Sequence, residues 1–269
     1  MMSLPGDPPD GQSVTGRHAD TQRPPVPVSA EDFARRKRRV MFTWIGAGML
    51  VMLLGIWTYW RSVDPLEAQR SLEEGKRFLR ATRYPEAVLS LTHALVLRSD
   101  LADAYLFRGR ANAALGRLDL AVADFSKVIQ LRPQGAEAFV ERATARLDQE
   151  DYPGVIADCG EALQRDSRIA LAFSLRARAL RQTGNPERAL EDLNRAVELA
   201  PDQSNYFQRA ATYQLMGRHK LALADLDEVI ALKPDGPQAY FARAQSRRAT
   251  GDVAGANQDH QQALLLDSR

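Results

Sequence analysis

The chain has 269 residues, of which 45% are hydrophobic and 26% are charged, a composition typical of proteins that bury a core. Its single cysteine, Cys159, excludes an internal disulfide and a cysteine-based metal cluster. The formal net charge is only +2, although the run Arg35–Arg39 alone (RRKRR) is fully basic, so the rest of the chain is slightly acidic. We therefore expect no nucleic-acid partner.

The first 39 residues are predicted to be a disordered, proline-rich and basic tail. Residues 1–34 are rich in proline, glycine, aspartate and serine and nearly lack large apolar side chains. Such a stretch cannot bury enough surface to offset the entropy cost of ordering it. A solvated tail is the simpler interpretation, and a polyproline ligand at the run RPPVPV is the alternative.

A transmembrane helix is predicted at Val40–Trp60. These 21 residues carry no charge. At about 1.5 Å each they extend roughly 31 Å, close to the thickness of a bilayer's hydrocarbon core. Trp57, Tyr59 and Trp60 cluster at one end, where amphipathic rings favour the headgroup level. We therefore expect a single-pass membrane protein.

The charges beside this segment predict its orientation. Five basic residues precede it and a balanced mixture of charges follows it, so the positive-inside tendency places the tail in the cytoplasm. The remainder of the chain is then expected on the non-cytoplasmic side, which in a bacterium is the periplasm beside the inner membrane. The reverse topology, with this remainder in the cytosol as a membrane-bound receptor, is the alternative.

Residues 61–67 are predicted to form a short linker. Asp64 followed by Pro65 is typical of a helix cap and a first helical position. A helix is therefore expected to begin there, which would hold the next part of the chain close to the membrane.

The remainder of the chain is periodic. The stretches Gly116–Pro133 and Gly217–Pro234 are identical at ten of eighteen positions, and Gly184–Pro201 is a third version. Their first glycines are spaced by 68 and 33 residues, and a period near 34 indicates a solenoid of helix–turn–helix units. Six repeats are predicted over residues 68–269: 68–101, 102–135, 136–169, 170–202, 203–236 and 237–269.

Each predicted repeat carries the same residue types at the same positions. Five of them have an aromatic residue near the start of the first helix and a glycine or alanine four positions later, and four have a glycine at the turn that follows. Small or β-branched residues recur seven positions apart in the second helix, and in three repeats a proline stops that helix. This pattern resembles the tetratricopeptide repeat family over about three quarters of the chain. The resemblance implies an all-α fold, a right-handed superhelix of antiparallel helix pairs, and a docking platform rather than an enzyme.

A pair of opposite charges accompanies repeats two to six. Each has an arginine in its first helix and an aspartate sixteen positions later in its second, whereas the first repeat has Glu74 and Ser90 there. Because both charges are missing together from the first repeat, a bridge between the two helices is favoured over a row of charges for a ligand. The predicted pairs are Arg108 with Asp124, Arg142 with Asp158, Arg176 with Asp192, Arg209 with Asp225, and Arg243 with Asp259.

The first helices of the family line a concave face, so the resemblance also implies where a partner would bind. The expected face has apolar patches and scattered positive charge, which suits an extended or helical peptide with acidic and apolar residues. A solvated basic face is the alternative. Asparagines of the kind that clamp chaperone carboxylates in some family members are missing. The residues expected to contact a partner are Leu106, Arg110, Val140, Arg178, Arg181, Phe207, Phe241 and Arg248.

Features of enzymes are sparse. His18, His93, His219 and His260 share no metal-ligand spacing, and Cys159 takes a position that is apolar in other repeats. We expect no catalytic residue, metal site, cofactor or small-molecule substrate. The predicted function is a membrane-tethered scaffold or adaptor that binds a protein or peptide, and a membrane-tethered enzyme is a remote alternative.

The last repeat differs from the others on its outer side. Asn257 and His260 stand where the other second helices have apolar residues. We therefore expect the sixth repeat to cap the array and the chain to be complete there. Leu264–Leu266 argue against this, because exposed leucines could support end-to-end association.

Overall fold

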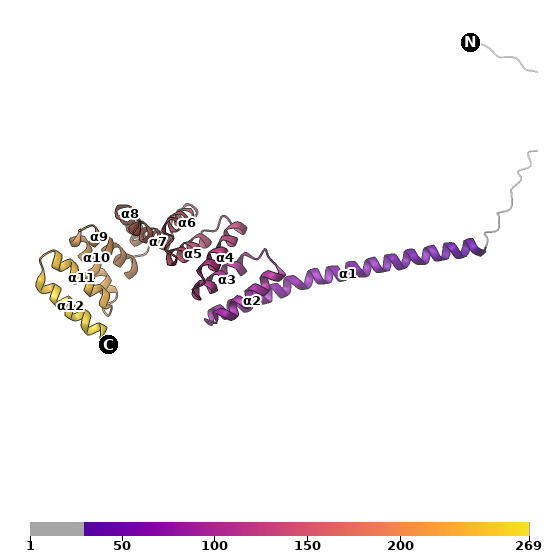
Figure 1. The fold of residues 1–269 in the computed structure, drawn as a ribbon, viewed down its shortest axis with the longest axis horizontal. Helices are drawn as coiled ribbons and strands as arrows, with labels where there is room; N and C mark the ends of the chain where they lie inside the picture. The colour runs from indigo at the N-terminus through magenta and orange to yellow at the C-terminus, as the bar shows by residue number, and fades with distance from the viewer. Residues whose placement is uncertain (1–29, 269) are drawn as a thin grey trace, which may run out of the picture. The chain divides into compact units, whose positions relative to one another are not determined.

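The computed structural model describes the backbone of residues 30–268 (Figure 1). Between residues 30 and 65 it describes side chains only at Glu31, Arg35, Lys37, 48–55 and Trp57. Residues 1–29, most of the predicted tail, therefore lie outside the described part. The described elements are twelve α-helices, and the chain divides into two compact units, residues 1–59 and 60–269.

Helix α1 (Ala30–Arg80) corrects two expectations at the N-terminal side. Residues 30–39 were assigned to the disordered tail but are helical, because alanine, glutamate, arginine and lysine are strong helix formers. The linker expected at residues 61–67 is also helical, so no helix begins at Pro65. A proline removes one backbone donor and can kink a helix without ending it.

The predicted span Val40–Trp60 falls within α1. Its described side chains, residues 48–55 and Trp57, are exposed, and the others lie outside the described set. Among the residues that are described, no helix is both long enough and apolar enough to cross a membrane.

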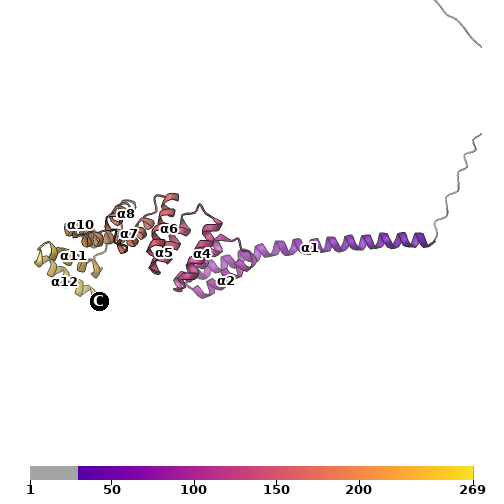
Figure 2. The same ribbon diagram turned by 45° about the horizontal axis from the view of Figure 1, so that its top comes forward.

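The second unit consists of antiparallel helix pairs (Figures 1 and 2). We call the earlier helix of each pair the first helix and the later one the second helix. The first repeat pairs the end of α1 with α2, and the other five follow in chain order. The helices are α2 (Tyr84–Leu97), α3 (Ala102–Ala114), α4 (Leu118–Leu131), α5 (Glu137–Asp148), α6 (Tyr152–Arg165), α7 (Ala170–Gln182), α8 (Pro186–Leu199), α9 (Gln203–Leu215), α10 (His219–Leu232), α11 (Pro237–Ala249) and α12 (Val253–Asp267).

The turn inside a repeat requires one residue in the left-handed conformation. Gly116, Gly184 and Gly217 supply it with φ of 71°, 78° and 71°, as glycine does without steric cost. Glu150 takes the same role in the third repeat with φ of 60°, so this turn tolerates a side chain where the pattern shows no glycine.

Small residues let the two helices of a repeat approach closely. A Cβ atom on Gly109 of α3 would lie 2.7 Å from the ring of Phe125 on α4, which is nearer than real Cβ atoms come to other atoms. Phe125 is fully buried at this contact. The recurring glycine or alanine of the first helix therefore makes room for the large apolar residue of the second.

The contacts between repeats define the inner side of the array. The first helices α3, α5, α7 and α9 each contact the first helix of the next repeat, whereas the second helices from α4 onward contact no second helix among the described residues. First helices therefore lie on the more tightly spaced side of the stack, where the concave face was expected. We call this side the groove.

The first repeat has a polar outer side. In α3, the positions that pack under the preceding repeat are Ala104 and Ala111, and both are fully buried. The equivalent positions of the first repeat are Arg70 and Arg77, which are exposed. Together with Glu73 and Glu74 they line an open hollow of about 520 Å³ on this side.

Candidate functional site

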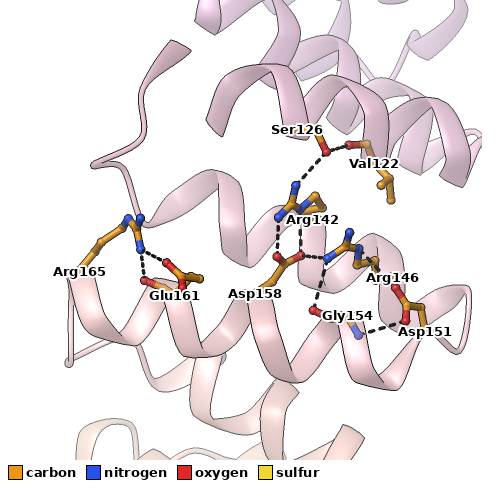
Figure 3. Close-up of polar contacts among 9 residues, drawn as sticks. All are labelled: Val122, Ser126, Arg142, Arg146, Asp151, Gly154, Asp158, Glu161 and Arg165. Atoms are coloured by element: carbon orange, nitrogen blue, oxygen red, sulfur yellow. Dashed lines mark hydrogen bonds and ion pairs between the residues drawn. The ribbon is translucent and has the colours of Figure 1, made fainter. Parts of the chain in front are cut away.

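The five predicted charge pairs form a ladder of bridges inside the stack. In the third repeat, Nε and Nη2 of Arg142 lie 3.0 and 2.6 Å from the two carboxylate oxygens of Asp158 (Figure 3). All five aspartates are buried, and each is held by two nitrogens of its arginine in this geometry. The bridges connect the two helices of one repeat, so these charges are not presented to a ligand.

Four of the five ladder arginines also contact the preceding repeat, which the repeat pattern did not reveal. Nη1 of Arg142 donates to Ser126 Oγ at 2.9 Å, on the second helix of the preceding repeat (Figure 3). Arg108, Arg209 and Arg243 reach Thr92, Asn194 and Asp227 in the same way. These four partners share one position of the second helix, two residues after the ladder position, and their polar side chains were the available signal. Arg176 is the exception, because the equivalent position is Gly160, which has no side chain.

Three of the ladder arginines have a raised pKa. The hydrogen bonds that Arg176 donates to Asp192 are the main cause for Arg176, and those donated to Asp225 and Asp259 are the main cause for Arg209 and Arg243. Each guanidinium also lies over the aromatic ring three residues before it, at 5.5 to 5.8 Å from the centroid. The aromatic residue of the repeat thus supports the bridge.

Two residues expected to contact a partner are buried. Leu106 is 6% exposed and shares a core cluster with Ala138 and Ala145 of the next first helix. Val140 is 8% exposed and shares one with Ala172. Their placement on a partner-accessible surface was wrong, because at these two junctions the side chain packs under the following repeat.

Arg110 lies in the groove but is already neutralised. Its Nη2 is 2.6 Å from Glu137 Oε1 and its Nε is 2.8 Å from Glu141 Oε1, both on the first helix of the next repeat. Burial disfavours the charge of Arg110, but Glu141 and then Glu137 outweigh it and raise its pKa. The neighbouring repeat thus supplies the anions that this arginine requires.

Arg178 occupies the position of Arg110 two repeats later, in different surroundings. The next first helix presents Ser204 and Gln208 where Arg110 meets Glu137 and Glu141. Arg178 is exposed and forms no ion pair within residues 66–268. Because Ser204 and Gln208 are uncharged, they offer the Arg178 guanidinium no carboxylate.

Arg181 lies one helical turn beyond Arg178 and is half-buried. Its Nη1 donates to the backbone oxygen of Gln208 at 3.3 Å, and it too has no carboxylate partner in the described part of the chain. Burial is the main cause that lowers the pKa of Arg181, and the charge of Arg178 lowers it further. Arg178 and Arg181 are therefore two neighbouring cations that are open to an anion from outside the described part of the chain.

The remaining predicted groove residues lie toward the last repeat. Phe207 is half-buried on α9 and Arg248 is exposed on α11. Phe241 stacks edge-on against His260, with 5.4 Å between the ring centroids. These rings and Arg248 line part of an open hollow of about 350 Å³ at the sixth repeat. The outer side of this repeat is therefore only partly polar, and Leu264 and Leu265 are exposed beside it.

Comparison with known proteins agrees with this architecture. The tetratricopeptide repeat family matches residues 72–136, 170–203 and 204–235. DnaJ homolog subfamily C member 3 of Mus musculus is 26% identical over 208 residues, which cover 71% of this chain and 40% of that protein. This chain thus matches less than half of that relative's length.

Two solved structures share the fold. The MamA protein superposes with a TM-score of 0.58 at 20% identity, over 63% of this chain and 93% of that one. YrrB, a tetratricopeptide repeat protein with an unusual peptide-binding site, superposes with a TM-score of 0.57 at 21% identity, over 66% and 92%. At these identities the likeness concerns the fold alone. The helix pairs, their ladder and the matched repeats together identify the second unit as an all-α solenoid of tetratricopeptide repeats.

Proposed function

We propose that the protein is a scaffold or adaptor that binds a protein partner in the groove of its fourth to sixth repeats. The observation that carries this proposal is the contrast between Arg110, which Glu137 and Glu141 neutralise, and Arg178 with Arg181, which face no carboxylate within residues 66–268. The half-buried ring of Phe207 on the next first helix adds apolar surface. A surface of this composition suits a peptide or helix with acidic and apolar residues.

The proposed activity is binding rather than catalysis. Among the described residues, two groups with large pKa shifts are Arg243, which Asp259 holds, and the buried thiol of Cys159, which burial keeps protonated with a pKa of about 12. Groups of this kind stabilise a fold rather than transfer protons at neutral pH.

Photo-crosslinking in native membranes tests the binding proposal. A photoreactive amino acid replaces Phe207 in the full chain, and the same amino acid at Glu191 on the second helix α8 is the matched control, since Glu191 is exposed outside the groove. We expect a discrete protein adduct from position 207 and none from position 191. Equal adducts at both positions, or none at either, would contradict binding in the groove.

We further propose that residues 40–60 tether the solenoid to a membrane, with the solenoid on the non-cytoplasmic side. The support is the uncharged run of 21 residues and the basic run Arg35–Arg39 before it. Full-length protein should stay in the membrane pellet after alkaline carbonate extraction, and a chain without residues 1–60 should be released. Protease added to sealed vesicles then separates the proposed topology from its reverse.

A further inference from the structure

The groove of the fourth and fifth repeats contains two arginines, Arg178 and Arg181, that form no ion pair with any residue the structure describes. Every ladder arginine has a buried aspartate, and Arg110 has two glutamates. Arg178 and Arg181 are next to each other on the inner side of α7, and their mutual repulsion is felt at Arg181. A partly desolvated cation without an anion is costly, so the arrangement favours any bound group that supplies one.

The chain itself shows how this position is satisfied when the partner is internal. Glu137 and Glu141 are four residues apart on α5, so they lie on one side of the helix and both reach Arg110. The equivalent residues of α9 are Ser204 and Gln208, which are uncharged. An internal carboxylate is thus replaced by a neutral side chain at one junction, while the arginine is retained.

We infer that Arg178 and Arg181 together form a carboxylate receptor that anchors an acidic segment of a protein partner in the groove. This inference rests on the proposed function and specifies the chemistry of its partner. Arg178 is exposed and is the arginine that an incoming carboxylate meets first. Arg181 is half-buried and oriented by its bond to the Gln208 carbonyl oxygen, so it is the anchoring group. Phe207 lies on the neighbouring helix and suits an apolar residue beside the acidic one.

The alternative occupants are less consistent with these residues. A nucleic-acid backbone would need basic residues repeated along the groove, yet Thr144 and Ala211 occupy the position of Arg178 in the repeats on either side. A single carboxylate-bearing segment fits the local character of the pair. Two guanidinium groups give it charge-assisted hydrogen bonds that water alone does not match.

The experiment uses the detergent-solubilised full chain and a fluorescein-labelled decapeptide of alternating glutamate and leucine. The same peptide with glutamine in place of glutamate is the control ligand, and fluorescence anisotropy measures both affinities. We expect the acidic peptide to bind more tightly than the neutral one, and Arg181→Gln to weaken its binding by about tenfold or more. Arg188→Gln removes an exposed arginine from the second helix α8 and should leave the affinity unchanged.

A second variant guards against loss of binding through misfolding. Gln208→Glu supplies the internal carboxylate that Glu141 supplies to Arg110, so it should abolish binding of the acidic peptide while keeping or raising the unfolding midpoint. Equal binding of the two peptides, or unchanged binding in both Arg181→Gln and Gln208→Glu, would show that the proposed carboxylate receptor is wrong.

The two proposals fail in different ways. If the adduct at position 207 forms in native membranes and is unaffected by Gln208→Glu, the groove binds a partner and the carboxylate receptor is wrong. If position 207 gives no adduct, the proposed function itself is wrong.

Discussion

The groove uses one arginine position in two ways. In the second and third repeats, Arg110 is bonded to Glu137 and Glu141 and takes part in the junction between repeats. In the fourth and fifth repeats, Arg178 at the same position faces Ser204 and Gln208 and is left open. Two residues on the following helix therefore decide whether this arginine stabilises the stack or remains available for binding. Repeat arrays can thus place a binding site without changing the residue that contacts the ligand.

The largest expected effect comes from removing the ladder beneath the open part of the groove. Asp192→Asn leaves Arg176 partly buried without its carboxylate, and breaking a buried ion pair in this way should lower the free energy of unfolding by about 3 kcal/mol. Urea unfolding followed by circular dichroism measures this change.

The second member of the pair provides the control. Arg176→Leu in the same chain removes the charge that Asp192→Asn leaves unpaired, and we expect the double variant to recover much of the lost stability. Strict additivity of the two single changes would mean that the bridge is not the source of the effect.

A smaller effect is expected where the groove is already neutralised. Glu141→Gln should lower the free energy of unfolding by about 1 kcal/mol, because Arg110 and Glu141 are each still partly exposed to solvent. Arg178→Gln is the matched variant at the open junction. It should change the free energy of unfolding little, because it leaves no carboxylate without its partner. If urea unfolding showed a similar loss of stability in both variants, the proposed difference between the neutralised and the open junction would be wrong.

The smallest effect is expected at Gly160, which stands where the other repeats have a side chain that bonds to the next ladder arginine. A Cβ atom there would meet no other atom within 4 Å, so Gly160→Ser fits the helix α6 without strain. Replacing a glycine inside a helix should raise the free energy of unfolding by roughly 0.5 kcal/mol. The new hydroxyl should add an acceptor for Nη1 of Arg176, as Ser126 does for Arg142. A decrease in the urea midpoint would show that this junction does not resemble the others.

The sequence predicted the repeating part of this fold well because the repeat signal is physical. Helices α3, α7, α9 and α11 begin at the residues where the predicted repeats begin, since small residues and turn glycines mark contacts that every copy must make. The ladder pairs follow from the same regular spacing. Contacts within a repeat can therefore be inferred from one repeat.

Contacts between repeats were harder to infer. The burial of Leu106 and the bond from Arg142 to Ser126 depend on how one repeat rests on the next, which residue spacing within a repeat does not specify. The helix at residues 30–39 was missed for another reason. The tail was assigned from its proline, glycine, aspartate and serine content and its lack of large apolar residues, while the helix propensity of residues 30–39 was given too little weight.

Arg70 and Arg77 make the outer side of the first repeat different from the sides that are buried at interior junctions. At interior junctions the same two positions are small and buried, as at Ala138 and Ala145, so a neighbouring repeat can close over them. A second copy of the protein that packed on this side like another repeat would have to remove water from the guanidinium groups of Arg70 and Arg77, which costs free energy. The two exposed arginines of the first repeat therefore disfavour the stacking of a second copy on this side, as if it were a further repeat.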